Sequence, residues 1–391
     1  MLWCLWDGRA NYDVSAGSAL EGASHNKIRS DKHLESETRL ALPGKGALEA
    51  ATMAFLAECG MKVNRSNPRQ YLAHISSMQG LEVVFQRAAD IPLLVQDGDA
   101  VLGITGYDIL AEHRGDGDEA GDEDDSDDDL IILARDLGYG GCRLVVAVPE
   151  TWIDVNTCAD LWHLAGYYHT RKGRGLRIAT KYPALTGQFL RRHGITHCKI
   201  ITPHGALEAA PLTDTADLIV DLTETGTTLR ENRLKLLDDG VVLRSQACLI
   251  ANARLLSRSE QALHLTVTML ELIDARMQAR HRSLLTAHIQ AENVNAVDSV
   301  CAELNRRLKA FATSGEFQLA SSRLLGDPDH HWYTISGEIN AGKGPAAELL
   351  EIVAVLRSVG AVHINVTPLS HRFDEESVSV RALKERMKRI R

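Results

Sequence analysis

Short apolar runs alternate with glycine turns and helical stretches along most of the chain, and this alternation constrains the fold more than any other feature. In the first cycle, residues 40–43 lead into the turn Gly44-Lys45-Gly46, and apolar side chains then recur at helical spacing up to Gly60. Strands joined through helices are normally parallel, so the pattern predicts an α/β fold with mostly parallel, helix-covered sheets split between two lobes. Later runs lie at 81–85, 101–105, 130–134, 144–148, 178–180, 199–202 and 218–222.

Composition disfavours two classes of protein. The 391 residues are 45% hydrophobic and 24% charged, the balance of a globular chain with two or three domains. No run approaches the roughly 18 apolar residues of a membrane-spanning helix, so we expect no membrane segment. Ten of the 52 acidic residues lie between Asp116 and Asp129, which leaves 42 acidic against 43 basic residues elsewhere. A body so close to neutral lacks the basic face of a nucleic-acid-binding protein.

Cysteine and histidine spacing predicts neither a zinc site nor a disulfide framework. The seven cysteines form no C-x-x-C pair, and the sixteen histidines contain no H-E-x-x-H motif. His330 and His331 are therefore interpreted as ordinary surface or core residues. Reduced thiols favour an intracellular compartment. We expect the cytoplasm, with a plastid stroma as the alternative.

Two segments are expected to lie outside the folded body. Residues 1–38 contain six acidic residues, which argues against both a secretory signal and an acidic-poor transit peptide. We expect a disordered N-terminal extension there. The acidic side chains of the insertion at 112–129 repel one another, and the segment offers little apolar area to bury. Both properties are typical of a solvated surface segment. It resembles a calcium loop in part, but Ala120 and Asp127 occupy positions that need an oxygen ligand and a glutamate.

A long helix precedes a separate C-terminal pattern. Residues 258–282 carry Leu263, Val267, Leu270 and other apolar side chains at spacings of three and four, which predicts an amphipathic helix joining two domains. The order beyond it is strand, helix, strand, strand, helix, strand. This βαββαβ order predicts a ferredoxin-like domain. The expected elements are 284–289, 294–311, 317–325, 332–339, 346–359 and 362–367.

The segment from Asp217 to Arg230 is the strongest candidate for a phosphate-binding loop. An apolar strand leads to a glycine and threonine turn and then to helix-forming residues. Unpaired N–H groups at a helix start attract phosphate, Gly226 permits close approach, and threonine hydroxyls add donors. The carboxylates of Asp221 and Glu224 suit ribose hydroxyls or magnesium. The plainer interpretation is a strand-to-helix turn in which Thr225 or Thr228 is the N-cap.

Four further residues are candidates, and three of them also have an ordinary structural interpretation. Lys45 lies on a glycine turn after a strand and is either a ligand contact or a solvated lysine. Tyr107 follows a strand end and either borders a base or packs in the core. Arg177 and Thr180 lie on a short strand and either reach the ligand or, for Arg177, pair with a surface carboxylate.

On these motifs, the chain resembles the long form of the ATP phosphoribosyltransferase family, and within it the branch found in plants and some bacteria. The resemblance extends from about Arg39 to Glu376. Its most specific parts are the segments 205–211 and 221–232, in this order and at this spacing. The remaining matching segments are 42–46, 67–71, 85–87, 103–106 and 177–180.

The resemblance implies an activity and roles for individual residues. The family transfers phosphoribosyl from phosphoribosyl pyrophosphate to N1 of ATP, the first step of histidine biosynthesis, with Mg2+ neutralising the departing pyrophosphate. Lys45 and Arg87 would face the pyrophosphate and triphosphate charges, and Asp221 and Glu208 the ribose. The loop around the 5-phosphate would comprise Asp221, Leu222, Thr223, Glu224, Thr225, Gly226, Thr227 and Thr228, while Tyr107, Arg177 and Thr180 would complete the substrate site. No metal ligand is assigned.

The same resemblance implies a domain plan. Residues 39–135 and 241–283 would form catalytic lobe I, and 136–240 lobe II, with the substrate cleft between them as in type II periplasmic binding proteins. Residues 284–391 would form a regulatory domain that binds histidine as a feedback inhibitor, and the protein would be a homohexamer. A domain used only for oligomer contacts is the alternative.

Three positions depart from the family pattern. Ala47 stands where an arginine is usual, Val101 where an aspartate is common, and Asp214 where a glycine is usual. Loss of the arginine would weaken phosphate binding, whereas Asp214 is harmless if its loop lies away from the phosphates. These departures motivate the alternative function, a non-catalytic relative that binds a phosphosugar or nucleotide.

Overall fold

The computed structural model describes residues 38–67, 69–115, 129–202, 206–308, 320–323, 332–339 and 346–390. Thr38 begins the first strand, and the rest of the expected extension lies outside the described residues, as do residues 116–128 of the acidic insertion and His330-His331. Within the described ranges, no helix has both the length and the apolar character needed to cross a membrane.

Lobe I is built on a seven-stranded sheet with the order β2-β3-β4-β1-β5-β12-β6. β1, β4 and β5 run parallel, so their carboxyl ends meet at one edge. The strands are β1 Thr38–Pro43, β2 Val63–Asn64, β3 Leu72–Ile75, β4 Leu81–Gln86, β5 Leu102–Gly106, β6 Leu130–Ala134 and β12 Ala247–Asn252. The helices are α2 Ala47–Glu58, η1 Ala88–Asp90, α3 Ile91–Gln96, α4 Tyr107–Arg114, α8 Ala253–Arg258 and α9 Glu260–Ala279.

Lobe II is built on a five-stranded sheet with the order β11-β7-β10-β8-β9. β8, β9 and β10 run parallel, while β7 is antiparallel to both β10 and β11. The strands are β7 Cys142–Pro149, β8 Leu176–Thr180, β9 Cys198–Ile201, β10 Leu218–Thr223 and β11 Leu234–Ser245. The helices are α5 Cys158–Lys172, α6 Pro183–Arg192, η2 Leu207–Ala209 and α7 Thr227–Glu231.

The chain crosses between the lobes twice, at 135–141 and at Gln246. β11 continues to Ser245, so the lobe boundary expected at residue 241 falls inside this strand. Residues 238–240, Asp-Asp-Gly, lie within β11, where its register against β7 shifts between Leu236 and Val241. The strands next to the crossings are β7, β11 and β12, and they pair antiparallel to their neighbours. Both sheets are therefore mixed rather than mostly parallel.

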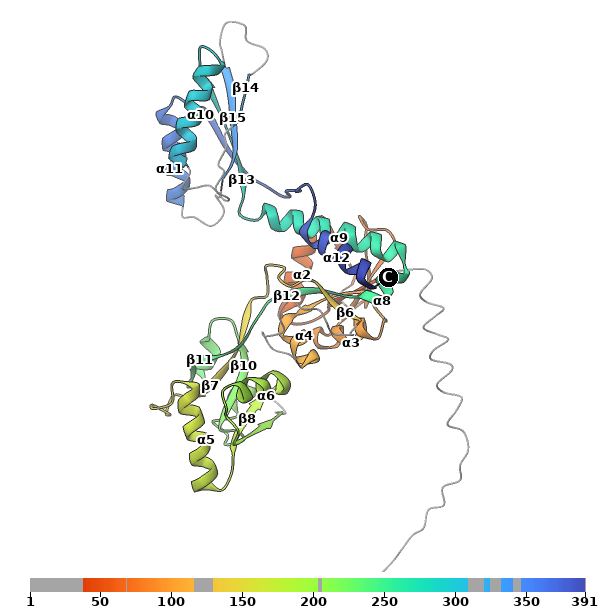
Figure 1. The fold of residues 1–391 in the computed structure, drawn as a ribbon, viewed down its shortest axis with the longest axis vertical. Coiled ribbons are helices and arrows are strands. Elements are labelled where there is room, and N and C mark those ends of the chain that lie inside the picture. Colours follow the sequence, from red (N-terminus) through yellow and green to blue (C-terminus); the bar gives the residue numbers. More distant parts are fainter. Residues whose placement is uncertain are drawn as a thin grey trace, which may run out of the picture.

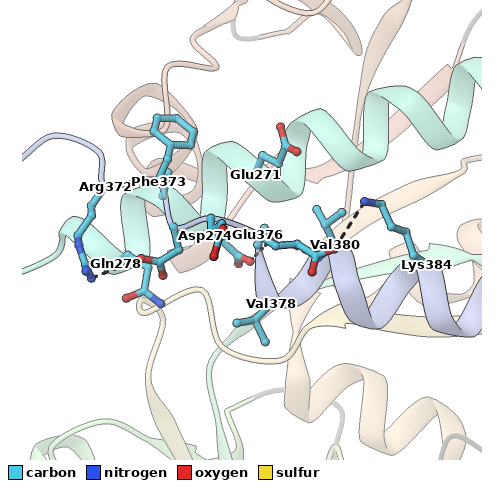
Figure 2. A pocket seen from close by; sticks show the side chains of 13 residues that line it. Glu271, Asp274, Gln278, Arg372, Phe373, Glu376, Val378, Val380 and Lys384 are labelled. Carbon is cyan, nitrogen blue, oxygen red and sulfur yellow. Dashed lines mark hydrogen bonds and ion pairs between the residues drawn. The ribbon is translucent and has the colours of Figure 1, made fainter. Parts of the chain in front are cut away.

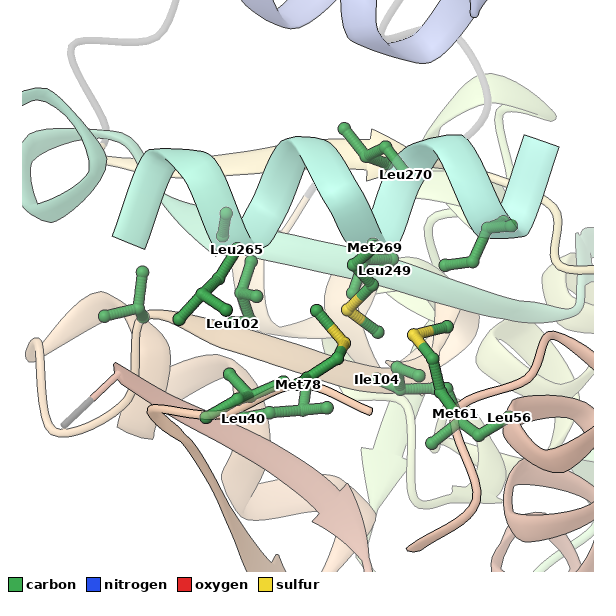
Figure 3. Packing of buried hydrophobic residues seen from close by; sticks show 14 of the residues in the cluster. Leu40, Leu56, Met61, Met78, Leu102, Ile104, Leu249, Leu265, Met269 and Leu270 are labelled. Atoms are coloured by element: carbon green, nitrogen blue, oxygen red, sulfur yellow. The ribbon is translucent and has the colours of Figure 1, made fainter. Parts of the chain in front are cut away.

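The lobe I core confirms the amphipathic character of the long helix. Leu265, Met269, Leu270 and Ile273 of α9 are buried in this core, and the predicted Leu263 and Val267 are partly buried against it. Figure 3 shows Leu265 and Met269 facing Leu40, Leu102 and Ile104, with Met61 and Met78 beside them, while Leu270 lies on the opposite side of the helix. Methionine suits irregular gaps in a core because its chain is unbranched and flexible.

The C-terminal segment has the expected βαββαβ order. Its four antiparallel strands lie in the order β14-β15-β13-β16, and α10 and α11 cover one face (Figure 1). A separate core lies between them and includes Leu285, Ile289, Leu304, Ile335 and Leu356. The elements are β13 Ser283–Gln290, α10 Val294–Leu308, β14 Ala320–Arg323, β15 Trp332–Ile339, α11 Ala346–Ser358 and β16 Val362–Pro368.

The last helix, α12 Val378–Ile390, leaves this segment and returns to lobe I, although the sequence placed residues 284–391 in one domain. Val380, Leu383 and Met387 are buried in the lobe I core. The helix start is held by Asp274 of α9, which accepts hydrogen bonds from Ser377 and from the backbone and side chain of Ser379. Figure 2 shows the cavity of 440 Å³ beside this joint, lined by Glu271, Gln278, Arg372, Glu376 and Lys384 among others.

Candidate functional site

The candidate site is the interlobe junction, defined here as the carboxyl ends of β4, β1 and β5 in lobe I and of β8 and β10 in lobe II. Strand register brings all of them next to the two crossings. Gly106 at the end of β5 pairs with Ala247, which follows the crossing at Gln246. Thr223 at the end of β10 pairs with Arg143, which follows the other crossing. Two sheets thus present their carboxyl edges at the same place, the usual ligand position in α/β proteins.

Lys45 and Arg87 follow the ends of neighbouring strands on the lobe I half of the junction. They follow β1 and β4, whose last residues, Pro43 and Gln86, are paired. Gly44 allows this approach, because its N–H donates to the Gln86 carbonyl at 2.7 Å and an added Cβ would meet Phe85 at 3.0 Å. Both cationic side chains are exposed. They are therefore accessible to an anion at this edge.

Tyr107 begins α4 directly after β5, and its side chain is only 6% exposed. Its N–H donates to the carbonyl of Gln246 at 2.8 Å, which fixes the end of β5 to the second crossing. The guanidinium of Arg135, from the first crossing, lies 4.4 Å from the centre of the Tyr107 ring. The ring is thus held by both crossings and is largely covered.

The predicted phosphate loop lies on the lobe II half and is internally braced. Gly226 has a φ of 79°, a left-handed conformation that favours glycine. Its N–H donates to the hydroxyl of Thr223 at 2.8 Å. The hydroxyls of Thr225 and Thr227 are 2.9 Å apart, and the side chains of Glu224, Thr225, Thr227 and Thr228 are exposed. A braced loop with several exposed hydroxyls is suited to holding phosphate oxygens without reorganising.

Asp221, at the end of β10, has an environment that opposes its charge. Burial raises its pKa, the negative charge of Glu208 on η2 adds to this, and the Leu222 N–H and the positive charge of Lys181 act in the opposite direction. The Leu222 N–H donates to Asp221 Oδ1 at 2.9 Å. The structure thus brings together Asp221 and Glu208, which the sequence paired. It adds Lys181, which follows β8.

The structure does not bring Arg177 to the junction. Arg177 lies at the amino end of β8, and its side chain bonds to Asp214 at 2.6 Å and to Asp217 at 3.1 Å. Asp217 also accepts two hydrogen bonds from Arg174, at 2.6 and 2.9 Å. These residues form a closed ion-pair network at the opposite edge of the lobe II sheet. The predicted contact between Arg177 and a ligand therefore has no support from the geometry of the junction.

The remaining predicted residues differ in their access to the junction. Thr180 ends β8 but is fully buried, and its hydroxyl accepts from the Tyr182 N–H at 3.0 Å. Leu222 is partly buried and packs against the apolar core. Of the three departures, Val101 precedes β5 and Asp214 precedes β10, both at amino edges, so neither lies beside the phosphate loop. Ala47 is exposed at the start of α2, next to the Gly44-Lys45-Gly46 turn.

Four junction residues, Asp108, Glu112, Lys181 and Tyr182, were missed from the sequence. Asp108 is 4% exposed and accepts the Tyr182 hydroxyl at 2.7 Å. Burial and the negative charges of Asp108 and Asp221 raise the pKa of Tyr182. In the sequence, only their positions could have indicated these residues. Asp108 comes just after Tyr107 at the end of β5, and Lys181 and Tyr182 come just after Thr180 at the end of β8.

Within the described ranges, a tight group of metal-type ligands occurs away from the junction. One ligand atom from each of Cys158, His193 and Asp239 lies within 4.8 Å of the others, between α5, α6 and β11. Hydrogen bonding within this group already uses Asp239, which accepts from the Cys158 N–H at 2.8 Å. At the junction, the carboxylates of Asp221, Glu208 and Glu224 are hard-oxygen donors of the kind that suit a magnesium ion.

The fold and the junction define a class: two-lobed α/β proteins with a phosphate-type loop on one lobe and exposed cations on the other. Comparisons with known proteins specify the family. A family model described as ATP phosphoribosyltransferase matches residues 87–272. ATP phosphoribosyltransferase from Chelativorans sp. (strain BNC1) is 46% identical over 213 residues, which cover 54% of this chain and 88% of that protein. ATP phosphoribosyltransferase 2, chloroplastic, from Arabidopsis thaliana is 35% identical over 341 residues, or 87% of this chain and 78% of that protein.

The chain belongs to the ATP phosphoribosyltransferase family, which catalyses the first step of histidine biosynthesis. It is thus related to pentosyltransferases, and the comparisons do not favour the alternative of a non-catalytic relative. Among solved structures, the Thermotoga maritima ATP phosphoribosyl transferase (HisG:HisZ) complex is 27% identical, with a TM-score of 0.44, and covers 61% of this chain and 98% of that chain.

Proposed function

We propose that the interlobe junction is the active site, with phosphoribosyl pyrophosphate on the lobe II half and ATP reaching it from lobe I. The observation that carries the proposal is that groups suited to binding phosphate lie on both sides of the junction. The braced Asp221–Thr228 loop lies at the end of β10, and the exposed cations Lys45 and Arg87 lie at the ends of β1 and β4. Both substrates are polyanions, and they must meet with their reacting atoms aligned.

The loop and the carboxylates would divide the binding of phosphoribosyl pyrophosphate between them. Hydroxyls of Thr225, Thr227 and Thr228 would donate to the 5-phosphate, and Asp221 with Glu208 would accept from the ribose hydroxyls. Ribose hydroxyls are neutral donors, so they relieve the charge repulsion between two carboxylates without adding negative charge. Tyr107 would border the adenine through the small part of the residue, 6%, that is exposed.

The reaction itself needs no nucleophile from the protein. The lone pair of adenine N1 forms a bond to the anomeric carbon of the ribose, and the bond from that carbon to the pyrophosphate oxygen breaks with its electron pair staying on pyrophosphate. Lys45 and Arg87 would stabilise the charge that develops on the leaving group, which is electrostatic catalysis by preplaced cations. Mg2+, held by the substrate phosphates and the carboxylates of Asp221 and Glu208, would supply further charge neutralisation.

The remaining proposals concern regulation and assembly. The βαββαβ segment would bind histidine and lower the activity of the lobes, and the protein would act as a homohexamer. It would work in the cytoplasm, or in a plastid stroma as the A. thaliana relative is chloroplastic. A molar mass of six times the 42.9 kDa chain by light scattering would support the hexamer.

The decisive experiment follows the absorbance of phosphoribosyl-ATP when purified protein meets ATP, phosphoribosyl pyrophosphate and Mg2+, with pyrophosphatase present. We expect turnover that added histidine suppresses. Calorimetry with phosphoribosyl pyrophosphate alone separates binding from chemistry. Folded protein that binds phosphoribosyl pyrophosphate but forms no product would contradict the proposed activity. Turnover that histidine does not affect would contradict only the regulatory part.

A further inference from the structure

One contact between the lobes is a helix cap supplied across the junction. The first N–H groups of a helix lack partners within the helix. α6 of lobe II has no capping side chain of its own. Glu112 of α4 in lobe I supplies the cap, because its carboxylate accepts from the Ala184 N–H at 2.8 Å and from the Leu185 N–H at 3.0 Å. The cap therefore exists only when the lobes are closed on each other.

A second contact joins both lobes to the crossing at Gln246. The Tyr182 hydroxyl, from lobe II, donates to Asp108 Oδ2 at 2.7 Å. The other oxygen of Asp108 accepts from the hydroxyl of Ser245 at 2.6 Å, and that hydroxyl in turn accepts from the Asp108 N–H at 2.8 Å. Ser245 is the last residue of β11 before the crossing. One oxygen of the Asp108 carboxylate is thus bonded to lobe II and the other to the residue just before the crossing at Gln246.

These contacts rest on apolar packing that is shared by the two lobes. Tyr107, Leu110 and Ala111 of α4 belong to the same buried cluster as Leu185 and Phe189 of α6. Gly106 keeps the space for the Asp108 carboxylate, because an added Cβ would lie 2.4 Å from Asp108 Oδ1. The polar contacts are therefore partly shielded from water, which strengthens them.

The contacts adjoin the residues assigned to both substrates. Asp108 follows Tyr107 on the lobe I side. On the lobe II side, Lys181 acts on Asp221 of the phosphate loop, and its neighbour Tyr182 is bonded to lobe I. A change in the angle between the lobes would therefore move the two half-sites relative to each other.

We propose that Asp108, Glu112 and Tyr182 form an interlobe clasp that positions the two substrates by holding the lobes closed. The clasp touches neither reacting atom. It sets the fraction of molecules in which adenine N1 and the ribose anomeric carbon can meet, and substrate binding completes closure. This inference rests on the proposed placement of ATP and phosphoribosyl pyrophosphate on opposite sides of the junction.

The test uses Tyr182→Phe and Glu112→Gln, which remove contacts of the clasp with little change of volume. When a binding-competent state is only partly populated, apparent affinity falls by that fraction. Loss of one such hydrogen bond therefore raises KM by about 2- to 12-fold. We expect the KM for ATP and the KM for phosphoribosyl pyrophosphate to rise by the same factor in each variant. We expect kcat to stay within about twofold, because saturating substrates restore closure.

Matched controls remove similar groups inside one lobe. Glu82→Gln loses an ion pair with Arg39 at 3.0 Å, and Glu58→Gln loses an ion pair with Arg276 at 2.7 Å. Both belong to lobe I and its α9 helix. We expect neither to change either KM, and circular dichroism establishes that all four variants fold.

X-ray scattering provides a readout that does not require activity. Without substrate, the clasp variants should have a larger radius of gyration than wild type, and the two substrates together should restore it. Unequal changes in the two KM values, or a fall in kcat alone, would overturn the clasp and assign the residues to one half-site or to the chemistry. An unchanged radius of gyration would also overturn it. A wild-type protein without turnover would defeat the proposed activity, yet the scattering result would still decide on the clasp.

Discussion

Two aspartates near opposite ends of strand β10 have opposite environments. Burial alone would raise the pKa of Asp217, but hydrogen bonds from Arg174 and Arg177 outweigh it and hold that pKa well below the usual range. Four residues further on, Asp221 is also partly buried, but Glu208 repels it and Lys181 compensates only in part, so its pKa is raised. A carboxylate with all its partners stabilises the fold. One whose charged form is disfavoured by its surroundings is available to a ligand, and such perturbed groups cluster at functional sites.

The largest expected effect of this difference is on catalysis. Asp221→Asn should lower kcat/KM by about 10- to 150-fold, the equivalent of one hydrogen bond to a charged group. Asp217→Asn should leave kcat/KM within about twofold in protein that is still folded. Steady-state kinetics at saturating Mg2+ measures both. Equal losses in the two variants would remove the functional distinction between the ends of β10.

Stability should show the reverse order. Asp217→Asn leaves Arg174 and Arg177 without their common partner and should lower the free energy of unfolding by about 1–3 kcal/mol at pH 7. Asp221→Asn removes a charge that the fold disfavours, so its free energy of unfolding should equal or exceed that of wild type. Urea denaturation compares the two variants. A clear loss of stability in Asp221→Asn would show that this carboxylate has structural partners.

The pH dependence sharpens the same contrast. Asp221 has a raised folded-state pKa, so its contribution to stability is present in acid and lost as the pH rises through that value. Activity runs the other way, and kcat/KM should fall in acid with a midpoint above the ordinary aspartate value of about 3.9. Asp221→Asn should lack this fall. For Asp217, stability is present above about 3.9 and is lost only as the pH drops towards its lowered pKa.

The smallest effect is expected at Asp214. Its ion pair with Arg177 is short, at 2.6 Å, but the Asp214 side chain is 92% exposed, so water screens the interaction. Its φ of 55° also favours glycine. Asp214→Gly should therefore change stability by less than about 1 kcal/mol and leave both KM values unchanged. A several-fold change in the KM for phosphoribosyl pyrophosphate would place this loop closer to the substrate than the structure does.

Local features of the fold were predictable from the sequence because they depend on neighbouring residues. Each apolar run between 81 and 222 forms a strand, and a braced glycine and threonine turn follows β10 where the sequence predicted a turn. Strands β2 and β3 were missed because they are short and carry polar residues such as Asn64 and His74. Periodicity could not place α12, since an apolar stripe shows that a face is buried but not which surface covers it.

The clasp was beyond sequence reasoning for a similar reason. Asp108 and Tyr182 are 74 positions apart, and Glu112 caps a helix 72 and 73 positions away. No local pattern distinguishes such pairs from other polar residues near strand ends. For Arg177 the sequence suggested a ligand contact that the fold does not provide. The residue lies in a matching motif, but it is at the amino end of β8, away from the junction.

The return of α12 to lobe I makes the βαββαβ segment, in topological terms, an insertion between α9 and α12 rather than an appendage. A chain truncated after residue 283 would lose Val380, Leu383 and Met387, and the apolar surface of lobe I that they cover would become exposed to water. Such a truncation would confound lost regulation with damaged folding. Excising the segment and rejoining the chain with a short linker between α9 and Ser377, which retains the contacts of Asp274, would separate the two.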